Sequence, residues 1–125
     1  GGETLSLAAS LATLRELREK KSLDHIWKMG SSLRDGYNAL AKSLGVDDTT
    51  RCVGYGCWPD LEFIGPDGKP SRPIQTLFTQ EIIKRGILTR PGMFICYAHT
   101  PEDISRTLAV YAESLAMAWL TRGWL

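Results

Sequence analysis

Two stretches of the chain carry apolar residues at intervals of three or four, which is the period of an amphipathic helix. The first spans residues 22–44 and ends at Gly45, a residue type that commonly closes a helix in the left-handed conformation. The second spans residues 100–115 and opens with a threonine, a proline and two acids, the composition of a helix N-terminus. Each stretch therefore predicts a helix, and Ser22 is the expected N-cap of the first. The apolar stripes consist of Ile26, Met29, Leu33, Tyr37, Leu40 and Leu44, and of Ile104, Leu108, Tyr111 and Leu115.

Two further helices are predicted, over residues 4–20 and 74–85. The earlier one has leucines at helical spacing with alanines beside them, so it is expected to pack against two neighbours. A membrane-surface helix is the alternative, but the stretch lacks the basic face and aromatic anchors of such helices. The later helix is expected to close at Gly86. The residues that define the two helices are Leu7, Leu11, Leu14 and Leu17, and Ile74, Leu77, Phe78 and Ile82.

Short runs rich in apolar residues and bounded by turn residues predict strands between these helices. Residues 51–56 and 61–64 are two such runs, joined through residues 57–60, and they are expected to pair as a hairpin. Residues 87–89 predict a third short strand, and residues 94–97 a further extended run. The order predicts an α+β fold, one domain over residues 1–125, with a small, mainly antiparallel three-stranded sheet covered on one face by about four helices. The expected core contains Leu33, Leu40, Val53, Phe63, Leu77, Phe78, Ile82, Ile104 and Leu108.

Composition narrows the class of protein. The 125 residues include 15 Lys and Arg against 14 Asp and Glu, a balance that argues against a nucleic-acid-binding surface. No apolar run approaches the ~20 residues that span a bilayer. Three cysteines, an odd number, do not make a disulfide framework. They are expected to be buried, reduced thiols in a cytoplasmic protein.

Candidate catalytic and metal-binding side chains are few. Cys96 and His99 stand three residues apart before the last helix, a spacing that allows a thiol–imidazole dyad. The alternative is a core thiol beside a turn histidine, since no orienting group is identifiable. His25 has no second ligand at metal spacing, so no metal site is expected. Gly54 and Gly56 lack the third glycine and the following helix of a dinucleotide-binding loop.

Three runs of sequence identify a family resemblance. The run QEIIKRGIL at residues 80–88 and the run YAHTPEDI at residues 97–104 resemble the end of class III pyridoxal-phosphate-dependent aminotransferases. The subgroup that fits is the one containing glutamate-1-semialdehyde aminomutase. The opening run GGETLSLAA resembles the segment that follows a phosphate-contacting threonine in that family. The resemblance covers essentially the whole chain, and it covers only the C-terminal small domain of such an enzyme.

The resemblance implies a homodimeric parent enzyme that uses pyridoxal phosphate to transfer an amino group between an amino compound and a carbonyl acceptor. The large cofactor-binding domain, with its Schiff-base lysine, is then absent, so this chain alone is expected to hold no cofactor and to catalyse nothing. Position by position, Gly1 and Gly2 fall at the end of the loop near the cofactor phosphate. Glu3 falls beside the mouth of the active site.

Two hypotheses follow for the function. In the first, the chain is a small domain that shapes substrate access and the dimer of its parent aminotransferase. In the second, it is a freestanding α+β module that binds a ligand or regulates another protein. Under the first hypothesis the missing domain and dimer partner leave apolar surface uncovered, so the chain is expected to self-associate through residues 5–17 or 119–125.

Overall fold

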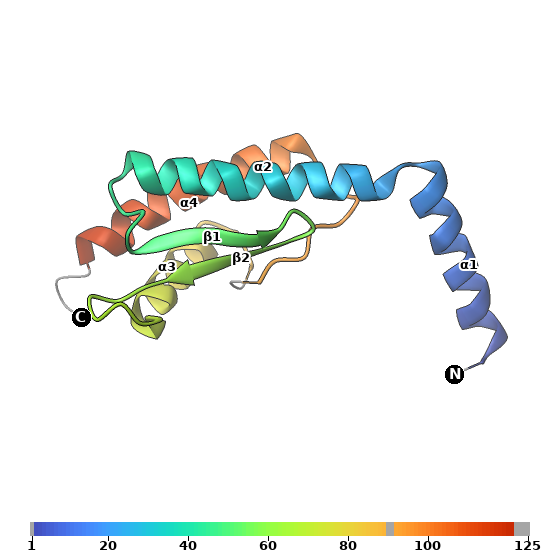
Figure 1. The fold of residues 1–125 in the computed structure, drawn as a ribbon, viewed down its shortest axis with the longest axis horizontal. Coiled ribbons are helices and arrows are strands. Elements are labelled where there is room, and N and C mark those ends of the chain that lie inside the picture. Colours follow the sequence, from blue (N-terminus) through green and yellow to red (C-terminus); the bar gives the residue numbers. More distant parts are fainter. Residues whose placement is uncertain (1, 90–91, 122–125) are drawn as a thin grey trace.

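The computed structural model describes residues 2–89 and 92–121 and contains four helices and a two-stranded sheet (Figure 1). The α+β class and the four predicted helices are confirmed. As predicted, α2 and α3 end where Gly45 and Gly86 adopt φ angles of +66° and +82°. No described helix is long and apolar enough to cross a membrane. In chain order the elements are α1 (Thr4–Glu19), α2 (Ser22–Ser43), β1 (Thr50–Tyr55), β2 (Trp58–Phe63), α3 (Arg72–Lys84) and α4 (Pro101–Thr121).

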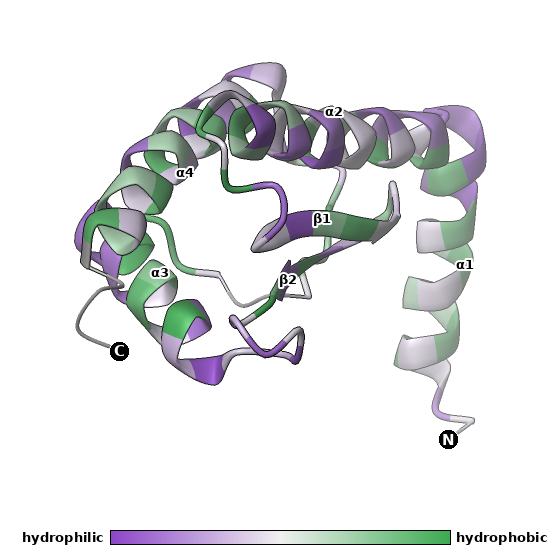
Figure 2. Ribbon diagram, turned by 60° about the vertical axis from the view of Figure 1, so that its left-hand side comes forward, coloured by the Kyte–Doolittle hydropathy of each residue, from purple (hydrophilic) through white to green (hydrophobic). Residues whose placement is uncertain are grey.

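Three of the helices pack around the hairpin formed by β1 and β2. Helix α2 contacts β1, α3 contacts β2, and α4 packs against both α2 and α3. Helix α1 extends from the beginning of α2 and stands apart from the hairpin (Figures 1 and 2). No residue of α1 is buried. The prediction of four helices over the sheet is therefore wrong for α1, because its apolar residues have no sheet beneath them.

The sheet has two strands, and the predicted third strand over residues 87–89 is wrong. The Ile87 N–H donates to the carbonyl of Ile82 (3.0 Å), so residue 87 belongs to the hydrogen-bonded end of α3. The segment that lies beside β2 is 92–95. The N–H of Met93 donates to Pro59 O (2.9 Å) and the N–H of Ile95 to Cys57 O (3.4 Å), and Gly92 bridges Asp60 in antiparallel fashion. These few bonds make an irregular edge rather than a full ladder.

The strand register decides which side chains face the core. Thr50 is paired with Phe63 and Cys52 with Leu61, and all four side chains are buried. Val53 was expected in the core, but it is paired with Asp60 on the opposite face and is only half-buried. The second strand begins at Trp58, three residues before the predicted start, so most of the expected 57–60 linker is strand.

The core is built around aromatic rings from three helices and one strand. The centroid of the Phe78 ring lies 5.2 Å from that of Phe63, 5.4 Å from that of Tyr111 and 6.3 Å from that of Tyr37. Of the predicted core, Leu33, Phe63, Phe78, Ile82 and Ile104 are buried, while Leu40, Leu77 and Leu108 are half-buried at its margin.

Helix α2 covers the outer edge of β1 with side chains. Asn38 donates through Nδ2 to Cys52 O (2.9 Å) and accepts the Cys52 N–H at Oδ1 (2.8 Å). Gly30 lies directly against the hairpin turn, because a Cβ built on it would meet the carbonyl oxygen of Gly56 at 1.6 Å. Glycine at position 30 therefore allows the helix and the hairpin turn to come this close.

The helix starts differ in how well they follow the sequence. At α4, Thr100 and Asp103 cap each other as predicted: Thr100 Oγ1 accepts the Asp103 N–H (3.2 Å), and Asp103 Oδ2 accepts the Thr100 N–H (2.9 Å). At α2 the prediction of Ser22 as N-cap is wrong. Lys21 precedes the helix with a φ of +49°, and the hydroxyl of Ser22, buried inside the first turn, donates to Glu16 O (3.4 Å).

Candidate functional site

The residues predicted to lie near a cofactor phosphate and a substrate are at the start of α1. Gly1 is outside the described residues. Gly2 has a φ of +92° and no atom near its Cβ position, so it stands in the open. Glu3 is the exposed N-cap of α1: its carboxylate accepts the Ser6 hydroxyl (2.7 Å) and the Ser6 N–H (3.2 Å). These bonds lower the pKa of the Glu3 carboxyl below its ordinary value.

The lysines test whether this chain can hold pyridoxal phosphate itself. A cofactor lysine forms its bond as the neutral amine, which requires a desolvated pocket that lowers the pKa. All six lysines of the sequence, Lys20, Lys21, Lys28, Lys42, Lys69 and Lys84, are exposed. At Lys20 the Glu16 carboxylate raises the pKa, which is the opposite direction. None of the six lysines therefore has the desolvated surroundings that a cofactor lysine requires.

The thiol–imidazole candidate does not form a nucleophile–base pair in the described residues. His99 Nδ1 accepts the backbone N–H of Cys96 (3.1 Å), so the imidazole contacts the main chain of Cys96. The His99 carbonyl in turn contacts Nε2 of His25 (2.7 Å). Cys96 is exposed, which corrects the expectation of a buried thiol, whereas Cys57 is half-buried and Cys52 is buried. All three thiols are free, and burial raises the pKa of Cys52 to about 12.

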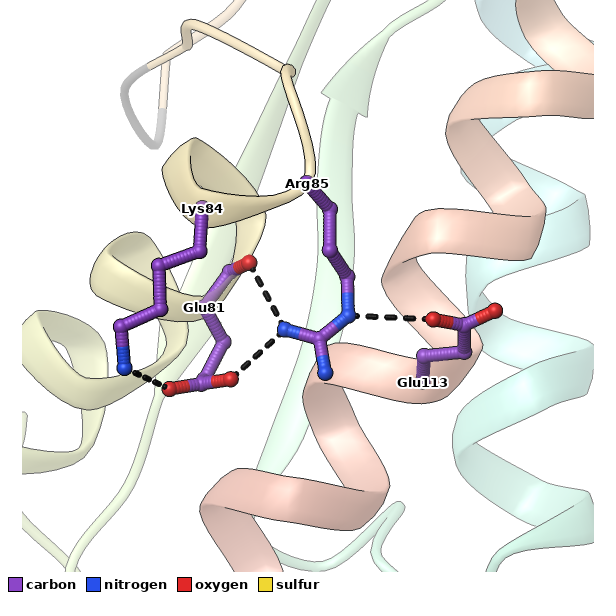
Figure 3. Close-up of polar contacts among 4 residues, drawn as sticks. All are labelled: Glu81, Lys84, Arg85 and Glu113. Atoms are coloured by element: carbon purple, nitrogen blue, oxygen red, sulfur yellow. Dashed lines mark hydrogen bonds and ion pairs between the residues drawn. The ribbon is translucent and has the colours of Figure 1, made fainter.

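Charged groups gather between α3 and α4, where they serve packing. Arg85 donates through Nε to Glu113 (3.0 Å) and through Nη1 to the carboxylate of Glu81 (2.6 Å), and Lys84 contacts the other oxygen of Glu81 (Figure 3). These ion pairs lower the pKa of Glu81. Each acid is neutralised by a neighbouring base, so the cluster joins two helices and offers no unpaired acid for catalysis.

No group of His, Cys, Asp and Glu in the described part of the chain could hold a metal ion.

Exposed aromatic side chains gather at the hairpin turn, a feature that the sequence did not predict. Trp58 stacks on Phe94, with ring centroids 5.2 Å apart and an interplanar angle of 18°. Trp27 meets Tyr55 edge to face at 6.2 Å. The sequence feature that could have indicated the Trp58–Phe94 stack is the alternation over residues 92–95, in which Met93 and Ile95 are buried and Phe94 is exposed.

A cavity of about 310 Å³ lies where residues 87–89 and 92–95 approach α4. Leu88, Phe94 and Thr107 contribute to its wall, together with His99 and Asp103. Asp103 Oδ2 is engaged in the helix cap and His99 Nδ1 accepts a backbone N–H. The arrangement can bind or bury an apolar group, and it does not present an acid–base pair.

Comparisons with known proteins identify the chain's relatives. No protein-family model matches it. It is 28% identical over 127 residues to glutamate-1-semialdehyde 2,1-aminomutase 2 of Brevibacillus brevis, which covers 94% of this chain and 30% of that protein. It is 30% identical over 104 residues to the aminopentol aminotransferase of Sphingopyxis macrogoltabida, covering 82% of this chain and 24% of that protein.

Comparison with solved structures also finds pyridoxal-phosphate enzymes. The FumI protein of Sphingopyxis sp. MTA144, solved in its PLP internal aldimine form, superposes with a TM-score of 0.82 and 26% identity over 94% of this chain and 28% of that one. The chain thus spans less than a third of the length of the relatives it matches, and the match lies in their C-terminal portion. In sequence and in fold, the chain is the counterpart of the C-terminal part of a class III, fold-type I pyridoxal-phosphate-dependent aminotransferase of the glutamate-1-semialdehyde aminomutase type.

Proposed function

We propose that the chain is the C-terminal small domain of an enzyme that transfers an amino group between an amino compound and a carbonyl acceptor, with pyridoxal phosphate as cofactor. The observation that carries the proposal is the match, in sequence and fold, to a segment of known aminomutases and aminotransferases that makes up less than a third of their length. The exposure of all six lysines supports the corollary that the cofactor is held by the remainder of the enzyme. In that enzyme this domain shapes substrate access and the homodimer, and the chain alone is inactive.

The proposal assigns roles to the first residues of the chain. Gly1 and Gly2 end the loop that lies near the cofactor phosphate, and Glu3 lies beside the mouth of the active site. An open backbone position that favours glycine, followed at once by a helix N-terminus, supports this assignment. The three free thiols suit a reducing compartment, so we place the enzyme in the cytoplasm.

Self-association of the isolated chain is part of the same proposal. Leu5, Leu7, Leu11 and Leu14 are all more than half exposed, and an apolar surface of this kind is seldom left uncovered on a monomer. The isolated chain is therefore expected to show reversible association in sedimentation at tens of micromolar, with residues 5–17 in the contact. The second expected contact, residues 119–125, lies mostly outside the described residues.

A chimera tests the function. The chain replaces the matching segment of the Brevibacillus brevis aminomutase, and the same protein without any replacement segment serves as the control. We expect the chimera to transfer an amino group from an amino donor to a carbonyl acceptor, measured by the appearance of the new amine, and the truncated control to fail. The isolated chain, treated with pyridoxal phosphate and borohydride, is expected to show no preferred lysine. Stoichiometric labelling of one lysine in the isolated chain, or a folded but inactive chimera, would contradict the proposal.

A further inference from the structure

His99 is bonded to both backbone groups of Cys96. Its ring nitrogen Nδ1 accepts the Cys96 N–H at 3.1 Å, and its own backbone N–H donates to the Cys96 carbonyl at 3.2 Å. A ring nitrogen that accepts a hydrogen bond carries no proton, so the neutral imidazole holds its proton on Nε2. Protonation of the ring places a second proton on Nδ1, and that proton points at the Cys96 N–H. The bond between the ring and the backbone therefore exists only while His99 is neutral.

Segment 94–97 depends on this bond more than the residue before it does. Met93 is buried, and its N–H donates to Pro59 O at 2.9 Å. Two residues later, the Ile95 N–H reaches a carbonyl of the hairpin turn only at 3.4 Å, longer than the usual range of about 2.7–3.2 Å. The side chains of residues 94, 96 and 97 are exposed. The bond to the His99 ring comes next along the chain, so the position of the segment beside β2 depends on it.

The residues that follow the segment are held by bonds that do not require a neutral ring. His25 Nε2 lies 2.7 Å from the His99 carbonyl oxygen. A carbonyl oxygen only accepts, so His25 is the donor, and a donating nitrogen keeps its proton whether the ring is neutral or charged. Thr100 and Asp103 cap each other at the start of α4. Protonation of His99 thus removes the bond to Cys96 and leaves these anchors in place.

The charged and titratable groups near His99 favour this response. They come from the end of α1, from α2 and α4, and from the segment itself, and they are Lys20, His25, Cys96, Tyr97, Asp103, Arg106 and Tyr111. Hydrogen bonds from Thr100 lower the pKa of Asp103, so this carboxylate is still negative when a histidine takes up its proton. Asp103 interacts electrostatically with both His99 and Arg106. The charged ring is therefore repelled by the Cys96 N–H and attracted by Asp103.

We propose that His99 is a pH-sensitive latch, whose neutral imidazole fixes segment 94–97 beside β2 and whose protonation releases it. Histidine changes charge between about pH 5 and pH 8, so the segment is fixed at the upper end of this range and released as the pH falls through it. Phe94 lies in the segment, stacks on Trp58 and contributes to the wall of the cavity of about 310 Å³. Release therefore opens that wall. The latch belongs to the chain itself and does not depend on the proposed amino transfer.

The experiment is an NMR titration of the chain between about pH 8 and pH 5, the range in which histidine changes charge. At the upper end we expect a nitrogen–nitrogen coupling across the hydrogen bond, between the Cys96 amide nitrogen and His99 Nδ1. The coupling should disappear as the ring takes up its proton. The ratio of released to fixed segment should rise about fivefold, the factor that corresponds to one net hydrogen bond, as measured from the amide chemical shifts of Phe94 and Cys96.

Two variants separate the two histidines. His99→Asn places an amide oxygen where Nδ1 lies, and this oxygen accepts a hydrogen bond at every pH. The variant should therefore keep segment 94–97 fixed over the whole titration. His25→Gln is the matched control, since its amide N–H donates to the His99 carbonyl without titrating. It should show the same pH-dependent release as the wild type.

Four results would overturn the latch. The first is a proton on His99 Nδ1 at the upper end of the titration, and the second is a release that persists in His99→Asn. The third is the loss of release in His25→Gln, which would assign the pH response to His25. The fourth is a simultaneous change in the amide shifts throughout α2 and α4, because the whole fold would then be responding rather than the segment.

Discussion

Replacing Phe78 with alanine is expected to lower the free energy of unfolding by about 3–5 kcal/mol. The side chain is 1% exposed, so the substitution removes a whole ring from the interior and leaves a cavity. Three rings lie with their centroids within 6.3 Å of it, those of Phe63, Tyr111 and Tyr37, and they come from β2, α4 and α2. Aromatic pairs contribute about 0.5–1.5 kcal/mol beyond the area they bury, so the loss should fall in the upper part of the range.

The assay is urea denaturation followed by circular dichroism, with the wild type and two variants measured together. Ile83→Ala is the matched control, since Ile83 is on the same helix but 49% exposed, and its loss should be about 0.5 kcal/mol or less. Domains of this size have roughly 5–15 kcal/mol in total, so Phe78→Leu provides a milder variant if the alanine variant is unfolded at the start. A loss of less than about 1 kcal/mol for Phe78→Ala, well below the usual 3–5 kcal/mol, would refute the placement of this ring at the centre of the core.

Three further predictions concern a backbone contact, an ion pair and a thiol. Gly30→Ala should lower the free energy of unfolding, measured by urea denaturation, by about 1–3 kcal/mol, because the new methyl group collides with the Gly56 carbonyl oxygen. This loss is expected although alanine favours a helix over glycine by about 1 kcal/mol. A stabilised variant would contradict the contact. The pKa of Glu81 is lowered in the fold, so its contribution to stability is complete above its ordinary value of 4.5 and is lost as the pH falls through the lower folded value. Glu81→Gln should therefore show a shallower loss of stability than the wild type below pH 4.5, and parallel curves would argue against the ion pair. In the native protein a disulfide reagent should modify Cys96 quickly and Cys52 only after urea unfolding, since Cys52 is buried with a pKa of about 12; rapid native labelling of Cys52 would place it at the surface.

Local chemistry explains the parts of the fold that the sequence predicts well. The Thr100–Asp103 cap is set by residues three apart, and the left-handed close of α3 at Gly86 depends on one residue type. Such features depend on residues that are close together along the chain, so the sequence pattern is enough to predict them. The phase of β1 is different. Cys52 and Val53 are both apolar, and only the register with β2 decides that Cys52 is buried and Val53 lies on the other face.

Some features of the candidate site could likewise be predicted from the sequence, and others could not. Exposure of the lysines was predictable, because they lie among polar residues on helix faces and in turns. The Trp58–Phe94 stack was not, since it requires residues 92–95 to lie beside β2, a contact between distant parts of the sequence. The assignments of Gly1, Gly2 and Glu3 came from family resemblance, and they stay predictions. Helix α1 shows a further limit: the spacing of its leucines predicts the helix correctly, but the packing expected of them is not found in the described residues, since no residue of α1 is buried.

Both outer edges of the sheet are engaged over their middle residues, which restricts how this chain can contact another protein. On the β1 side Asn38 occupies the N–H and the carbonyl of Cys52, and Arg34 donates to Gly54 O at 3.4 Å. On the β2 side the N–H groups of Met93 and Ile95 take the carbonyls of Pro59 and Cys57. An exposed sheet edge is the usual template for adding a strand from another chain. A partner strand would first have to displace these side-chain and backbone donors, so adding a strand over the middle of either edge would be costly.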